Sequence, residues 1–184
     1  MKKLLLVCSV WGLTISVVFA QKVFTREGKI SFFSEAPMEK IEAHNGTVTS
    51  VLDMNGGRME FAVLVKAFKF EKALMQEHFN ENYLESDKYP KATFKGQIAD
   101  FNPASLTQDG KTKVTVTGDL TIHGVTKSVS IPATLKVEKG VVTGAATFEV
   151  AVADYNIEIP SLVRDKVAKV VRIEVLMPYQ PMNN

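Results

Sequence analysis

"GDLTIHGVTKSVSIPATLKV", residues 118–137, is the stretch that decides the fold of this chain. Apolar and polar residues alternate on both sides of a kink at His123–Gly124, which is the period-2 pattern of half-buried β-strands. The stretch therefore reads as strand, turn and strand. The histidine at the kink is open to three interpretations: a catalytic group, a metal ligand or a structural residue in a binding scaffold.

The same strand pattern continues on either side of this stretch. Asn45–Gly46 and Asn55–Gly56–Gly57 predict turns between short β-rich runs, because these residues admit positive φ. Lys139–Gly140 predicts a tight hairpin. Only residues 70–86, "FEKALMQEHFNENYLES", have helical spacing of their apolar residues. We expect one domain with about eight strands and one helix.

Antiparallel strands with one helix fit either a closed barrel or a sandwich. Two features favour a barrel: the turns follow one another as in a meander, and several strands are apolar on both faces. The clearest of these is residues 141–152, where Ala145, Ala146 and Ala151 stand beside larger apolar residues. One face of a small barrel lines a lumen, and small residues leave room inside it. The alternative is a helix-covered sandwich in which the alanines serve tight packing.

The first twenty residues predict a cleaved secretory signal peptide, so that the mature domain covers residues 21–184. Lys2 and Lys3 precede an apolar run, and Val18-Phe19-Ala20 offers small residues at the cleavage site. We therefore expect a periplasmic or secreted protein. The one cysteine, Cys8, falls within the signal, and its removal leaves a mature domain without thiol chemistry.

Charge composition argues against nucleic acid as a partner. The chain has 22 basic and 20 acidic residues, and removal of Lys2 and Lys3 leaves 20 of each. A nucleic-acid surface needs clustered Lys and Arg, and the sequence has no such cluster.

Two motifs resemble the YceI-like family. "YLESDKYPKATFKGQI", residues 83–98, is similar to the family's helix-exit segment through Asp87, Tyr89, Pro90, Thr93 and Phe94. "GDLTIHGVTKSV", residues 118–129, resembles its second signature, from Gly118 through His123 and Gly124 to Thr126. Residues 29–48 depart from the family's usual Lys-His element, so no role is carried over to His44.

The resemblance implies an exported, extended antiparallel β-barrel, similar to lipocalins, whose lumen holds a long polyisoprenoid or similar lipid. The expected partners are this lipid and, transiently, a membrane, and no cofactor is expected. An envelope interaction or stress-related barrel without lipid cargo is the alternative. Inward-facing apolar residues of the expected strands are the candidates for the lumen: Phe32, Met59, Phe61, Val63, Phe94, Leu120, Val129, Ile131, Phe148 and Val150. Candidates for contact with a polar head group are His123, Arg164, Lys166 and Arg172.

Catalysis and metal binding are disfavoured by the residues available. A hydrolytic site needs a nucleophile, a base and an orienting group, and the three histidines, His44, His78 and His123, stand in no catalytic motif. The sequence has no His-Xaa-His pair and no calcium-loop pattern. We therefore expect a non-enzymatic protein in which His123 bonds a neighbouring group at the turn and Gly124 supplies the backbone conformation. Contact of His123 with a head group is the competing interpretation.

Overall fold

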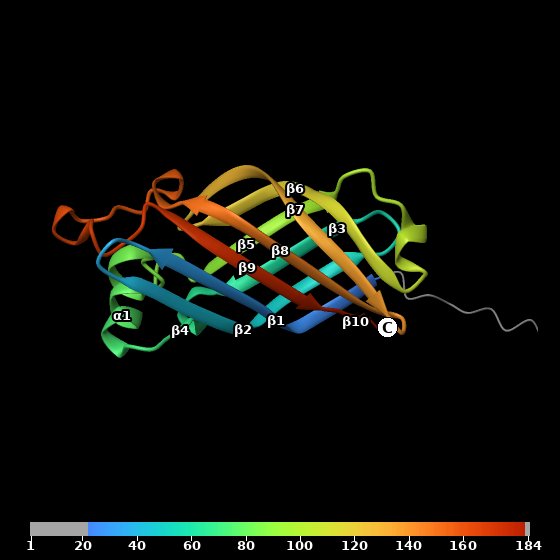
Figure 1. The fold of residues 1–184 in the computed structure, drawn as a ribbon, viewed down its shortest axis with the longest axis horizontal. Coiled ribbons are helices and arrows are strands. Elements are labelled where there is room, and N and C mark those ends of the chain that lie inside the picture. Colours follow the sequence, from blue (N-terminus) through green and yellow to red (C-terminus); the bar gives the residue numbers. More distant parts are fainter. Residues whose placement is uncertain (1–21, 183–184) are drawn as a thin grey trace, which may run out of the picture.

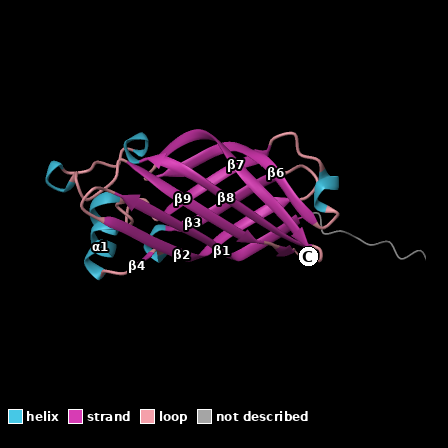
Figure 2. Ribbon diagram, in the orientation of Figure 1, coloured by secondary structure: helices cyan, strands magenta, loops and turns pink. Residues whose placement is uncertain are grey.

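Long antiparallel strands dominate the computed structural model, which describes residues 22–182 (Figures 1 and 2). The ten strands are β1 Lys22–Glu35, β2 Lys40–Asp53, β3 Arg58–Leu64, β4 Lys69–Phe70, β5 Lys91–Ile98, β6 Gly110–Ile122, β7 Val125–Glu138, β8 Val141–Ala151, β9 Val170–Pro178 and β10 Gln180–Pro181. The α-helix α1 spans Ala73–His78, and short 3-10 or π turns cover Val65–Ala67, Phe79–Tyr83, Pro103–Leu106, Val152–Tyr155 and Ser161–Val163. The predicted signal peptide and Gln21 lie outside the described residues.

Eight of these strands close into a barrel, which confirms the predicted fold. Their order around the ring is β1-β9-β8-β7-β6-β5-β3-β2, and pairing of β1 with β2 closes it. The closure is visible at Ile30, which pairs with Val175 of β9 and with Asn45 of β2. Every pairing is antiparallel, and β5 to β9 follow one another as the predicted meander. The β4 and β10 strands only extend the sheet at its ends.

The stretch at residues 118–137 forms the β6–β7 hairpin, so the kink at His123 is a full reversal of the chain. Ile122 pairs with Val125, and His123 and Gly124 between them have φ of 50° and 73°. Two successive positive φ values are the type I′ geometry that matches the twist of a hairpin. Lys139–Gly140 forms the predicted second hairpin with φ of 50° and 77°.

Period-2 alternation places one face of each strand inside the barrel. Val116 and Leu120 of β6 and Ile131 and Leu135 of β7 are less than 9% exposed. On β9, Val171, Ile173 and Val175 are half-buried, whereas the neighbouring Val170 and Leu176 are exposed, as their alternation predicts.

The β7 and β8 strands separate at the end of the barrel that carries α1. Their pairing covers only Ala133–Glu138 of β7. Beyond it, the 3-10 turn Val152–Tyr155 contacts both strands, and the backbone oxygen of Tyr155 lies 3.1 Å from Nδ1 of His123. The turn therefore closes the wall where the ladder between the two strands stops.

The predicted turn at Asn45–Gly46 is wrong, because both residues lie inside β2. The pairing with β1 shifts register here, which marks a bulge. Asn45 is 2% exposed, its Oδ1 accepts hydrogen bonds from Thr47, and its Nδ2 donates to the Leu64 oxygen. The side chain thus satisfies backbone that the irregular ladder leaves unpaired. His44 bonds Ser31 at 2.7 Å and Glu42 at 2.6 Å.

The predicted helix is present but short. Only Ala73–His78 is α-helical, and Phe79–Tyr83 continues it as a π turn. No side chain caps its N-terminus at Lys72, and the strand β4 occupies the start of the segment expected to be helical. Packing against the barrel end, rather than local capping, therefore holds this helix in place.

Candidate functional site

A large apolar cavity, called here the main cavity, lies inside the barrel at the end that carries α1. Its volume is about 510 Å³, within the range of about 300–1,000 Å³ usual for small-molecule sites. The strands contribute a wall that is almost entirely apolar: Ile30, Phe32, Ser34, Ile41, Phe61, Phe70, Ala92, Leu120, Ile122, Phe148, Val150, Val171, Ile173 and Val175.

Segments outside the barrel strands line the main cavity at its α1 end, around its mouth. The helix and its π turn contribute Leu74, Met75, His78, Phe79 and Tyr83. The loop between β8 and β9 contributes Ile157, Ile159, Val163 and Val167. Sequence reasoning did not include these loop residues among the candidates, although their spacing at 157, 159, 163 and 167 is a weak apolar pattern that could have indicated them.

Four phenylalanine rings form a cluster beneath the helix. Phe79 stacks on Phe32 at 5.3 Å between centroids and contacts Phe70 at 5.0 Å and Phe68 at 5.7 Å. Aromatic pairs at such distances are more favourable than their buried area alone accounts for. The cluster therefore fixes the helix against β1 while it lines the cavity.

A second, smaller cavity lies deeper in the barrel and is called here the deep cavity. Its volume is about 60 Å³. Its walls come from β3, β5, β6, β7, β8 and β9 and include Met59, Phe61, Phe94, Ile131, Ala146 and Phe148. Phe61, Phe148 and Val175 line both cavities.

The predicted lumen residues divide among these two cavities and the solid core. Phe32, Phe61, Leu120, Phe148 and Val150 line the main cavity. Met59, Phe94 and Ile131 line the deep cavity. Val63 and Val129 line neither; Val63 is 3% exposed in the core, and Val129 packs against that core. The roles of all these residues in binding stay predictions.

Polar side chains at the main cavity gather where it meets the surface. Lys72 and Glu39 form an ion pair of 3.2 Å that joins the start of α1 to the β1–β2 turn. Lys166 and His78 also line this region. Burial raises the pKa of Tyr83 above its ordinary value, so its hydroxyl is neutral at physiological pH.

Of the four head-group candidates, only Lys166 lines the main cavity. Arg164 is exposed, and its Nε donates to the Ser161 oxygen at 3.1 Å. Arg172 pairs with Glu174, and its guanidinium lies 4.0 Å from the centre of the Phe33 ring. His123 lies at the β6–β7 turn, where both of its ring nitrogens already have protein partners.

The two motifs at residues 83–98 and 118–129 meet at this turn. Nε2 of His123 lies 2.7 Å from a carboxylate oxygen of Glu85, and its ring meets Tyr89 edge-on at 4.7 Å. A Cβ atom on Gly124 would lie 2.4 Å from the Tyr89 ring. These contacts account for His123 and Gly124 as structural residues that join the hairpin to the segment after the helix.

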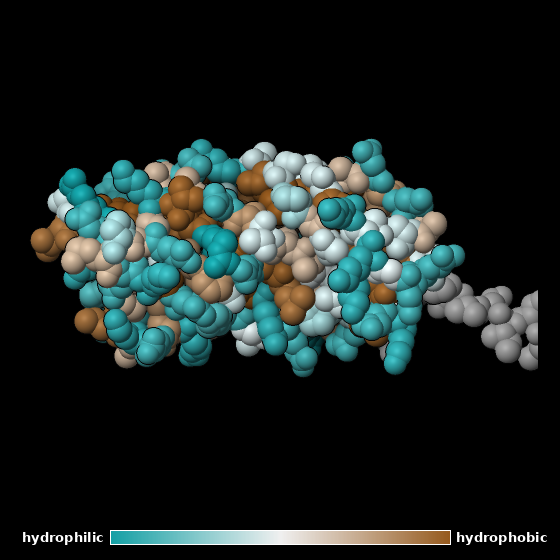
Figure 3. Space-filling view, in the orientation of Figure 1, coloured by the Kyte–Doolittle hydropathy of each residue, from teal (hydrophilic) through white to brown (hydrophobic). Residues whose placement is uncertain are grey.

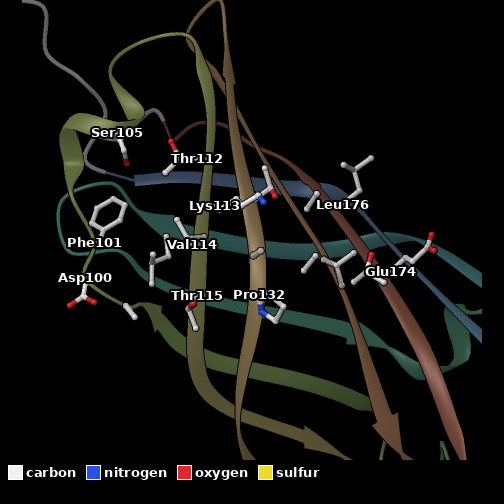
Figure 4. Close-up of a pocket in the computed structure, with 18 of the residues that line it drawn as sticks. Asp100, Phe101, Ser105, Thr112, Lys113, Val114, Thr115, Pro132, Glu174 and Leu176 are labelled. Atoms are coloured by element: carbon white, nitrogen blue, oxygen red, sulfur yellow. The ribbon is translucent and has the colours of Figure 1, made fainter.

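A further hollow lies on the outside of the barrel, and Figure 4 shows residues that line it. This outer groove has a volume of about 1080 Å³, and its lining includes Asp100, Lys113, Thr115, Pro132 and Glu174. Its mixture of charged, hydroxyl and apolar groups suits an apolar chain less well than the main cavity does. Ala145 and Ala146 line both the groove and the deep cavity, so this part of β8 forms a thin wall between them.

The surface around the mouth of the main cavity carries exposed apolar side chains. Leu162, Met38 and Leu74 are 92%, 71% and 60% exposed. The backbone N–H of Met38 donates to the Asp165 oxygen, which places the β1–β2 turn beside the loop that holds Leu162. Figure 3 shows hydrophobic residues among hydrophilic ones at this end, on the left.

Neither a metal cluster nor a membrane-spanning helix occurs among the described residues. Between residues 22 and 182, no group of three or more His, Cys, Asp or Glu side chains could hold a metal ion. No helix in the same range is long and apolar enough to cross a membrane.

Known structures share this architecture at low sequence identity. A polyisoprenoid-binding domain from Saccharophagus degradans, implicated in plant cell wall breakdown, aligns with a TM-score of 0.77 at 12% identity, covering 89% of this chain and 100% of that one. BcnA from Burkholderia cenocepacia aligns with a TM-score of 0.69 at 20% identity, covering 82% and 95%. A YceI protein from Campylobacter jejuni aligns with a TM-score of 0.51 at 15% identity over the whole of both chains.

The sequence itself matches one known protein family. No curated protein matches the chain. The YceI-like domain, however, matches residues 16–177, a range that contains both motifs and every residue that lines the main cavity. The chain therefore belongs to the YceI-like domain family.

Proposed function

We propose that this protein is an exported, non-enzymatic carrier that holds an isoprenoid or similar lipid chain in the main cavity and exchanges it with a membrane. The observation that carries the proposal is the cavity itself, about 510 Å³ of space inside a barrel with an almost entirely apolar wall. An apolar chain gains about 0.8 kcal/mol for each CH₂ group that such a wall removes from water.

The arrangement of polar groups supports an amphiphile rather than a pure hydrocarbon. Lys72, Glu39 and Lys166 lie at the mouth, whereas the walls farther inside are formed by groups such as Phe61, Leu120 and Phe148. A lipid with its chain inside and its polar end at the mouth would match both regions. The described polyisoprenoid-binding activity of the domain from Saccharophagus degradans, which shares the fold, supports the same ligand class.

Reversible exchange is expected because the ligand comes from a membrane and not from water. A lipid chain in a bilayer is already out of water, so its transfer into an apolar cavity gains little net free energy. Such a protein loads and unloads reversibly. The exposed Met38, Leu74 and Leu162 around the mouth supply apolar contacts for a membrane surface, and the signal-peptide pattern of residues 1–20 supports export.

Native mass spectrometry of the purified protein, followed by organic extraction of any bound molecule, tests this proposal. We expect an additional mass that disappears on extraction and is recovered as an apolar chain. Protein that remains free of lipid after incubation with isoprenoid-containing vesicles would overturn the carrier proposal. The alternative, an envelope interaction or stress-related barrel without cargo, would then be preferred, and the outer groove is the surface that favours it.

A further inference from the structure

The lumen is divided into two compartments by side chains that line both. Phe61, Phe148 and Val175 border the main cavity and the deep cavity alike. In the closed ring of eight strands, β3 and β8 are separated by four steps in either direction. Phe61 on β3 and Phe148 on β8 therefore extend into the lumen from opposite walls.

Phe94 supports this division from the deep side. It is paired with Phe61 across β3 and β5, and the two rings stack at 5.5 Å with 15° between their planes. Phe94 is 2% exposed, and a Cβ atom on Gly96 would lie 2.5 Å from its Cζ. The Phe94 ring thus lies over Gly96, shielded from solvent, and its stacking holds the Phe61 ring in place between the two cavities.

Space beyond the division is small. The deep cavity holds about 60 Å³, and the core around it is closed by Leu135, Met177 and Tyr179, each 5% exposed or less. The hydroxyl of Tyr179, which follows β9, bonds Ser50 of β2 at 2.9 Å. The lumen is therefore open at the α1 end and blocked at the other.

The volume of the main cavity sets the length of chain that fits. An engineered cavity of about 150 Å³ accommodates benzene, which corresponds to about 25 Å³ per carbon atom. On that scale the 510 Å³ of the main cavity hold about 20 carbon atoms, or four isoprene units. A chain of eight units would need about twice that volume.

We propose that Phe61, Phe148 and Phe94 form a stop that limits the bound chain to about four isoprene units, inserted tail first, with its polar end at Lys72 and Lys166. This inference rests on the proposed function and adds the length and orientation of its ligand. The stop is a specificity determinant: a longer chain would leave carbon atoms outside the mouth, where they gain nothing from the cavity.

The test uses the whole protein and a series of isoprenoid alcohols with two, three, four, six and eight units, presented together at equal mole fraction in phosphatidylcholine vesicles. Native mass spectrometry of the protein recovered from the vesicles gives the chain length retained. For the wild type we expect a maximum near four units. Phe61→Ala joins the two cavities and adds the space of one ring, about eight further carbon atoms in all, so its maximum should move up by one to two units.

Two further variants keep the result interpretable. Phe61→Leu removes less volume and serves if Phe61→Ala fails to fold, with a smaller shift in the same direction. Phe33→Ala is the matched control, because Phe33 faces outward against Arg172 and lines neither cavity of the described lumen; its chain-length profile should equal that of the wild type.

Retention of the eight-unit chain by the wild type as readily as the four-unit chain would overturn the stop and leave the proposed function standing. An unchanged maximum in folded Phe61→Ala or Phe61→Leu would do the same. Retention of no chain by any form would instead overturn the proposed function, and the stop with it.

Discussion

Replacing Ala92 with phenylalanine distinguishes an empty lumen from a filled core. Ala92 lies on β5, opposite Val63, and its half-buried side chain lines the main cavity. The added ring needs about the volume that benzene fills, roughly 150 Å³, which is less than a third of the 510 Å³ present. It therefore fits without displacing its neighbours.

Two opposite effects are expected from this substitution. Filling a cavity commonly stabilises a protein by about 0.5–2 kcal/mol, which raises the Tm of a domain this size by about 2–4 °C per kcal/mol. The same ring takes the space of about six carbon atoms of ligand, nominally about 5 kcal/mol of burial from water. Loss of that burial weakens binding from water by about three orders of magnitude.

Scanning calorimetry of the lipid-free protein and native mass spectrometry after incubation with isoprenoid-containing vesicles measure the two effects. Ala43→Phe is the control, because Ala43 is 0% exposed and lines none of the three hollows described above: the main cavity, the deep cavity and the outer groove. Overpacking at Ala43 should lower the free energy of unfolding by about 1–3 kcal/mol. If Ala92→Phe lowers the Tm as Ala43→Phe does and leaves lipid retention intact, the lumen is solid core and the reasoning fails.

The remaining predictions concern the stability of the barrel. His123→Ala removes the partner of the Tyr155 backbone oxygen and should lower the free energy of unfolding by about 1–3 kcal/mol, measured by thermal unfolding, while ligand selectivity stays unchanged. An unaltered Tm together with a changed ligand would instead indicate that His123 contacts a head group. Gly124→Ala should cost more than Gly140→Ala, since both glycines have positive φ but only at Gly124 would the new Cβ meet another residue, Tyr89, at 2.4 Å; equal losses in denaturant unfolding would show that this contact is unimportant. Burial raises the pKa of Tyr179 above its ordinary value near 10, so the stability that its neutral form contributes is present below pH 10 and is lost as pH rises above it. Tyr179→Phe should therefore flatten the alkaline decline of unfolding free energy, and a pH profile parallel to that of the wild type would contradict this cause.

Sequence patterns were sufficient for the local structure where each residue responds to its immediate neighbours. Alternation along residues 118–137 predicted two strands, and positive-φ residues at Lys139–Gly140 predicted a hairpin that is present. The same rule failed at Asn45–Gly46, because the register of β2 against β1 absorbs the extra residue as a bulge instead of reversing the chain. Residues that favour positive φ indicate that the backbone leaves the regular strand ladder at that point. The pairing of the neighbouring strands decides whether the departure is a hairpin turn or a bulge.

The sequence by itself determined which residues face inward, because the period of a strand is a local property. It could not determine that Phe61 lines a cavity while Val63, on the same face of the same strand, lies in solid core. That difference depends on which side chains arrive from strands across the ring and from the loop between β8 and β9. Only closure of the barrel brings Phe61 and Phe148, 87 positions apart in the chain, to opposite sides of one lumen. The total volume of the side chains that meet there then decides how much of the lumen stays empty.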